Sequence, residues 1–147
     1  MLMQNANSPH GLSTTEKDEL MIGMKKYRVY IDSGASMSVV KHLAMLIPGT
    51  FMPCEGNIFS STPQDEPVTI EGRGQISFMG RRIGVLYSSR ILENVLSEGC
   101  LCQTYSFRIA KDGPYVTITD KLSPQHRNVA SWRIQGKMYP VPEVLLR

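Results

Sequence analysis

The chain has 147 residues, with 16 basic and 13 acidic side chains for a net charge of +3 at pH 7. This length suits a single domain with a sizeable core, and the mild, scattered charge does not favour nucleic acid as a partner of this domain. No apolar run reaches the roughly 18 residues that a membrane span needs, and the polar start lacks the apolar region of a signal peptide. We expect a soluble, cytoplasmic protein that contacts no membrane.

The three cysteines, Cys54, Cys100 and Cys102, form an odd set. An odd count fits a reducing compartment better than a disulfide framework, so we expect all three to be reduced. Cys100 and Cys102 lack the second pair of cysteines or histidines that a tetrahedral zinc site requires, and the histidines are scattered along the chain. The sequence therefore predicts neither a bound metal nor a cofactor.

The first strand of the domain leads directly into an acidic side chain. Residues 1–25 are polar without a sustained period, which predicts a flexible leader before a domain at 26–147. Over 27–31 apolar and polar residues then alternate, as in a half-buried strand. This strand ends at Asp32, and Ser33 and Gly34 are residues that turn the backbone. The pattern predicts a loop that presents a carboxylate.

The next part of the chain contains a helix candidate and a hairpin. Residues 39–46 suit one or two helical turns, stopped by Pro48. Residues 57–59 and 68–70 have the composition of two strands, and the polar segment 60–66 between them contains a proline. We therefore expect a hairpin whose tip projects into solvent.

The remaining elements are mostly strands. Gly72 and Gly74 predict a bend or a bulge. Residues 92–101 suit a short helix, whereas 139–142 contain two prolines and permit only an edge strand or an extended arm. The segments with strand periodicity are 82–87, 105–109 and 115–119, the last two joined by a turn into a second hairpin. No internal repeat is visible.

An Asp-Ser-Gly tripeptide is weak evidence by itself, because turns favour the same three residues. Its context is more specific, because the order of strand, Asp32 loop, apolar segment and hairpin resembles the retropepsin-like aspartic proteases. More narrowly, the chain resembles the protease of copia-type retrotransposon polyproteins. The segments that carry the resemblance are Ile31–Ser36, Ile70–Phe78, Val85–Tyr87, Asn94–Ser97 with Leu101, Lys111–Gly113 and Gly136–Tyr139.

The resemblance implies an all-β fold with one or two short helices: a retropepsin-like closed β-barrel, one lobe per chain, in a two-fold homodimer. It implies an aspartic endopeptidase that processes a retrotransposon Gag-Pol polyprotein, itself included, in the cytoplasm or within virus-like particles. Asp32 is then catalytic, and Ser33, Gly34 and Ala35 form the active-site loop. The hairpin is the flap, and its substrate-binding residues are Ile58, Phe59, Ser60, Ser61 and Thr62.

The chemistry that this resemblance implies requires a partner. Aspartic proteases use two carboxylates that share one proton, because two like charges about 3 Å apart cannot both ionise. This chain contains one Asp-Ser-Gly and no repeat, so the second Asp32 must come from a second copy across a two-fold axis. We expect an extended polypeptide as substrate, with the flap pairing to its main chain. Residues 138–144 are the candidate for further dimer contacts.

Two other functions compete with this one. Ser36 lies in Gly34-Ala35-Ser36-Met37-Ser38 with His42 nearby, but the final glycine of a nucleophile elbow is missing, so a serine hydrolase is disfavoured. The stronger alternative is a domesticated or inactive retropepsin-like dimer that binds peptides without turnover. The retained aspartate favours catalysis, because a scaffold has no chemical need for a costly charge at a dimer axis.

Overall fold

The computed structural model describes residues 27–59, 67–136 and 138–147, and within them the chain is mostly β-strand with few, short helices. The predicted leader lies outside the described residues. One sheet has the strand order β10-β1-β6-β2-β5-β4-β3 and a second has the order β7-β8-β9. The strands are β1 (Val29–Asp32), β2 (Val39–Val40), β3 (Met52–Phe59), β4 (Pro67–Phe78), β5 (Arg81–Tyr87), β6 (Asn94–Ser97), β7 (Phe107–Asp112), β8 (Tyr115–Asp120), β9 (Val129–Arg133) and β10 (Met138–Pro140). The helical segments are η1 (Leu43–Met45), α2 (Glu98–Gln103), η2 (Pro124–His126) and η3 (Glu143–Leu146). The prediction of a β-rich chain with short helices is confirmed.

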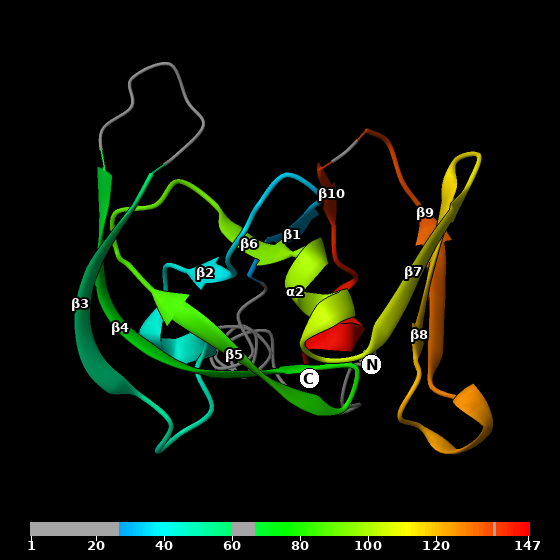
Figure 1. Ribbon diagram of the computed structural model, residues 1–147, viewed down its shortest axis with the longest axis horizontal. Helices are drawn as coiled ribbons and strands as arrows, with labels where there is room; N and C mark the ends of the chain where they lie inside the picture. Colours follow the sequence, from blue (N-terminus) through cyan, green and yellow to red (C-terminus); the bar gives the residue numbers. More distant parts are fainter. Residues whose placement is uncertain (1–26, 60–66, 137) are drawn as a thin grey trace, which may run out of the picture.

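The centre of the larger sheet contains an inserted strand. β1 and β2 are consecutive in sequence but do not pair; instead β6 lies between them, parallel to β1 and antiparallel to β2 (Figure 1). Its register places Leu96 beside Ile31 and Ser97 beside Asp32. The loop from β1 to β2 must therefore pass over the end of β6, which brings the Asp32 loop next to the start of α2.

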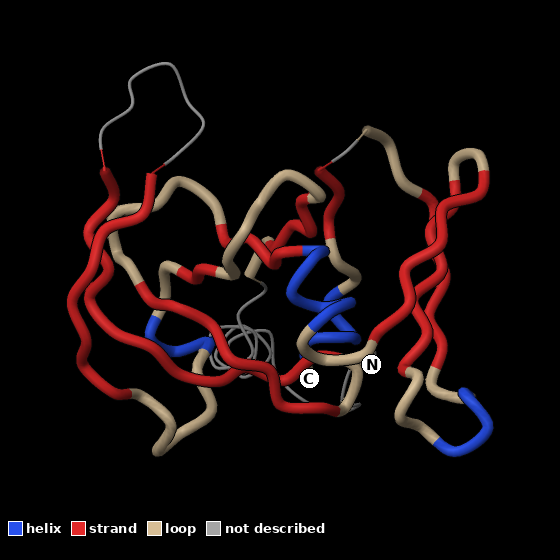
Figure 2. The backbone as a smooth tube through the Cα atoms, viewed as in Figure 1, coloured by secondary structure: helices blue, strands red, loops and turns tan. Residues whose placement is uncertain are grey.

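The expected closed barrel is not formed by the described strands. Closure requires the first and last strands of a sheet to pair with each other, whereas β3 and β10 are the two edges of the larger sheet. The three-stranded sheet packs beside β10, where Trp132 Nε1 donates a hydrogen bond of 3.0 Å to the Pro140 carbonyl. Figure 2 shows this sheet at one end of the molecule and the β3–β4 hairpin at the other.

One apolar core runs through both sheets. Val29 and Ile31 are buried while Arg28 is exposed, which confirms the alternation predicted for the first strand. Phe78 of β4 and Phe107 of β7 meet edge to face with ring centroids 5.2 Å apart, in the preferred range for aromatic pairs. The second sheet is therefore part of the same packed unit as the first.

Two predicted helices are partly strands. Residues 94–97 of the predicted 92–101 helix form β6, and only 98–103 are helical. Residues 39–40 form β2, and 43–45 form only a 3-10 turn. Both strands lie at the centre of the sheet and are almost wholly buried, so they lack the alternation that marks a half-exposed strand. Their tertiary position decides their conformation.

The predicted hairpins are present, but the predicted bend is elsewhere. Ile58 pairs with Val68 in the first hairpin, and β7 pairs with β8 in the second. β4 passes Gly72 and Gly74 without a break, and the register shift lies in β3 between Pro53 and Gly56. The two glycines instead make room for side chains: a Cβ on Gly74 would lie 2.9 Å from Leu46 Cδ1.

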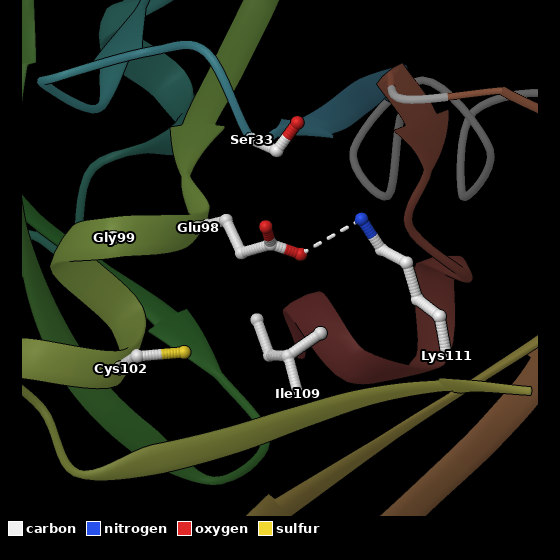
Figure 3. Close-up of a pocket in the computed structure, with 6 residues that line it drawn as sticks. All are labelled: Ser33, Glu98, Gly99, Cys102, Ile109 and Lys111. Atoms are coloured by element: carbon white, nitrogen blue, oxygen red, sulfur yellow. Dashed lines mark ion pairs between the residues drawn. The ribbon is translucent and has the colours of Figure 1, made fainter.

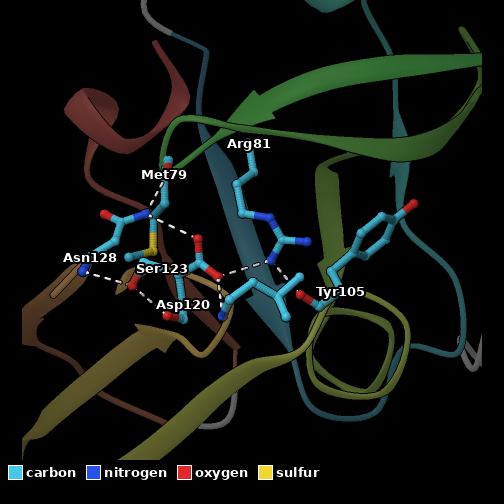
Figure 4. A network of polar contacts seen from close by, with 7 residues as sticks. Met79, Arg81, Tyr105, Asp120, Ser123 and Asn128 are labelled. Atoms are coloured by element: carbon cyan, nitrogen blue, oxygen red, sulfur yellow. Dashed lines mark hydrogen bonds and ion pairs between the residues drawn. The ribbon is translucent and has the colours of Figure 1, made fainter. Parts of the chain in front are cut away.

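A buried polar network fixes the second sheet to β5. Asp120, 3% exposed at the end of β8, forms an ion pair of 3.2 Å with Arg81 (Figure 4). Arg81 also donates to the carbonyl of Tyr105, and Asn128 Nδ2 donates to the carbonyl of Met79 at 2.7 Å. Buried charges are tolerated when paired in this way, so we assign this aspartate a structural role.

Candidate active site

Asp32 is held by strands on both sides of its backbone. It is the last residue of β1, opposite Ser97 of β6 and Met138 of β10. Asp32 is half-buried as a residue; its carboxylate accepts a hydrogen bond of 2.8 Å from Gly34 N–H through Oδ1, and Ala35 N–H donates to its carbonyl at 3.3 Å. Within the described residues Oδ2 accepts no hydrogen bond. One oxygen is therefore oriented by the turn while the other remains available.

The loop after Asp32 is fastened to β6 and α2 by a buried serine. Ser97 Oγ donates to the Ala35 carbonyl at 2.7 Å and accepts from Cys100 N–H at 3.1 Å, so one hydroxyl caps α2 and holds the loop. Cys100 Sγ donates to the Ser36 carbonyl at 3.3 Å, and Ser97 N–H donates to Ser38 Oγ at 2.9 Å. The conformation of the loop thus depends on contacts with residues about sixty positions away.

A second buried polar residue orients the strands that support the loop. Asn94, 4% exposed, accepts from Lys41 N–H at 2.8 Å and donates through Nδ2 to the Arg28 carbonyl at 3.0 Å. Asn94 and Ser97 belong to a segment that carries the family resemblance, but the sequence predicts no contact with the Asp32 loop for either residue. A usable signal was present for Ser97, because a serine directly before an acidic first turn is typical of a helix N-cap.

An open pocket of about 370 Å³ lies beside the loop. Its lining residues are Ser33, Glu98, Gly99, Cys102, Ile109 and Lys111 (Figure 3). Glu98 forms an ion pair of 3.1 Å with Lys111 and accepts a hydrogen bond of 3.0 Å from Tyr139 Oη. Burial, and then the charge of Glu98, raise the pKa of Tyr139 well above its ordinary value. This phenol therefore serves as a hydrogen-bond donor.

The structure brings together one part of the predicted site. Ser33, Gly34 and Ala35 form the turn around Asp32. Ile58 and Phe59 end β3 in the predicted hairpin, whereas Ser60, Ser61 and Thr62 lie outside the described residues. His42, considered with Ser36 for a hydrolase, has its ring 4.8 Å from that of Tyr27.

The part of the chain that the structure describes contains no group of three or more His, Cys, Asp or Glu side chains placed to hold a metal ion. No helix in the same ranges has the length and apolar character to cross a membrane. Comparison of the chain with protein-family models, curated proteins and solved structures gave no match. The interpretation of the site rests on its own residues.

Proposed function

We propose that the protein is an aspartic endopeptidase that acts as a homodimer, with one Asp32 from each copy. The observation that carries this proposal is the Asp32 carboxylate at a strand end, oriented through Oδ1 by Gly34 and open at Oδ2. The other described aspartates lie elsewhere: Asp112 is the exposed last residue of β7, and Asp120 is paired with Arg81. The nearby Glu98 is committed to Lys111 and Tyr139. A second copy is the source of a matching carboxylate.

The reaction then follows from a shared proton. One Asp32 is ionised and takes a proton from a water lying between the two carboxylates, while the water oxygen bonds to the scissile carbonyl carbon. The other Asp32 is protonated and gives its proton to the carbonyl oxygen, forming a tetrahedral diol. In the second step a carboxylic acid protonates the leaving nitrogen, the C–N bond breaks, and a diol proton returns to a carboxylate.

The surroundings of Asp32 are compatible with an extended peptide as substrate. The turn that carries Asp32 contains an exposed glycine, Gly34, which presents no side chain to an approaching backbone. The β3–β4 hairpin ends at Phe59 and Pro67, and as the proposed flap it pairs with the substrate main chain and excludes water. We further propose, from the sequence resemblance, that the substrate is a retrotransposon polyprotein containing this domain.

The proposal is tested by peptide cleavage with wild-type protein and Asp32→Asn. A peptide library digested between about pH 3 and about pH 8 should be cut internally by the wild type, and the rate should fall by at least about 100-fold in Asp32→Asn. The asparagine amide is nearly isosteric with the carboxylate and can still accept the Gly34 hydrogen bond, so Asp32→Asn should fold like the wild type. An unchanged circular dichroism spectrum of the variant is the control. A wild type that dimerises and binds peptides but cuts none at any pH favours the binding module instead.

A further inference from the structure

The pocket beside Ser33 has the composition of a protein-binding surface. Ser33 lies on one side of it, Cys102 and Ile109 on the other, and the Glu98–Lys111 ion pair between them (Figure 3). Cys102 and Ile109 are half-buried and give the pocket an apolar floor. A mixture of apolar floor and polar rim is typical of protein interfaces.

Gly99 leaves the α2 side of the pocket open. This residue is exposed, and a Cβ built on it would have a single neighbour within 4 Å, the Ser97 hydroxyl at 3.8 Å. Another chain can therefore approach the helix backbone closely at this point. A Cβ at this position is therefore in ordinary van der Waals contact, so a substitution here can start from an unstrained side chain.

The position of Ser33 indicates what occupies the pocket. In the proposed dimer the Asp32 carboxylates lie about 3 Å apart across the two-fold axis. Ser33 is the next residue and is exposed, so it must lie close to the partner. The pocket that Ser33 lines is then continuous with the contact at the axis.

The charges of the pocket suit a like copy. A two-fold interface places the same patch of both copies in contact, so a patch with a net charge repels itself. Glu98 and Lys111 neutralise each other at 3.1 Å, and the pocket contributes no net repulsion although each chain carries +3 overall. An acidic or basic partner would gain little from such a surface.

We infer that the pocket formed by Ser33, α2 and β7 is part of the surface on which the second copy docks. This inference rests on the proposed function, because it takes the two-fold axis from the shared Asp32 pair. It adds that the dimer interface extends from the active-site loop over Gly99 to Lys111, through residues that take no part in the chemistry.

The test compares Gly99→Trp with Arg108→Trp by sedimentation over a range of concentrations. Arg108 is an exposed residue of β7 next to the pocket residue Ile109, and successive strand residues point to opposite faces. We expect Gly99→Trp to weaken dimerisation by at least about 30-fold, with an unchanged circular dichroism spectrum, and Arg108→Trp to leave it unchanged. If both variants dimerise like the wild type, the docking surface is wrong while the shared-carboxylate mechanism stands.

Two other outcomes separate the proposals. If Gly99→Trp dimerises normally but raises KM for cleaved peptides, the pocket belongs to the substrate and the inference is overturned. If the wild type is monomeric at every concentration, the shared dyad fails, and the docking surface with it.

A variant-free measurement covers the case in which Gly99→Trp does not fold. Reductive methylation of wild-type lysines, followed by mass spectrometry, should show Lys111 protected at high relative to low protein concentration. The exposed Lys121 should react equally at both. Equal reactivity of Lys111 at both concentrations, in a protein that dimerises, contradicts the inference.

Discussion

Replacing Ser97 with alanine tests how strongly the active-site loop depends on β6 and α2. Ser97 is 1% exposed, and its hydroxyl forms two hydrogen bonds, donating to the Ala35 carbonyl and accepting from Cys100 N–H. Loss of the helix cap costs about 1 kcal/mol, and the partly buried Ala35 carbonyl left without its donor costs about 1–3 kcal/mol. We expect Ser97→Ala to lower the free energy of unfolding by about 2–4 kcal/mol.

Urea unfolding followed by circular dichroism measures this loss. Ser131→Ala is the matched control, because Ser131 also forms hydrogen bonds through its hydroxyl but is exposed on β9. Water replaces those bonds, so the control should change stability by no more than about 0.5 kcal/mol. A loss for Ser97→Ala as small as that of the control would refute the assigned role of Ser97.

Three further predictions concern the packing, the Arg81–Asp120 network and the acid response. Gly74→Ala should lower the free energy of unfolding by about 1–3 kcal/mol, since the new Cβ would lie 2.9 Å from the core side chain of Leu46. Gly56→Ala is the control, because a Cβ at Gly56 would have no neighbour within 4 Å and should change stability little. Urea unfolding measures both variants. Asp120→Ala should cost about 2–3 kcal/mol because it removes the partner of Arg81 in a partly buried ion pair, and a loss below about 1 kcal/mol would show that the pair is dispensable. Two hydrogen bonds of 2.7 Å from Ser89 hold the pKa of Glu71 below its usual value. The stabilisation of the folded state by ionised Glu71 is therefore present above the unfolded pKa and is lost as pH falls through the lowered folded pKa. Melting curves should therefore show the difference between wild type and Glu71→Gln shrinking toward acid pH, and a constant difference would contradict this assignment.

The strands next to solvent could be predicted from the sequence. β1, β5 and the β7–β8 hairpin expose one face, so their apolar and polar residues alternate. The same alternation marked Asp32 as the end of a strand, and the turn residues after it indicated that the carboxylate is presented in a loop. This part of the candidate site was visible because it depends on neighbours in the sequence.

The inserted strand could not be predicted in the same way. β6 pairs with β1 along one edge and with β2 along the other. Its polar residues Asn94 and Ser97 can be buried because their side chains form hydrogen bonds with distant backbone groups. In the sequence these residues look like the polar side of a short helix. Their true role depends on which strands they separate, and that information is absent from local periodicity.

The bend predicted at the glycines of β4 is absent for a similar reason. Gly72 and Gly74 suggest a bend, but in the structure they leave space for the side chains of Phe51 and Leu46, respectively. Glycine at a strand position is consistent with either a bulge or close packing. The choice between them depends on long-range contacts.

The most direct test of the shared-carboxylate claim is a subunit-mixing experiment. A fixed amount of wild-type protein is equilibrated with increasing amounts of Asp32→Asn, and peptide cleavage is measured. If each active site takes one Asp32 from each copy, random pairing reduces activity per wild-type chain to about half at equal amounts of the two proteins. Activity that stays proportional to wild-type protein, whatever the amount of Asp32→Asn, would show that one chain suffices and would contradict the account.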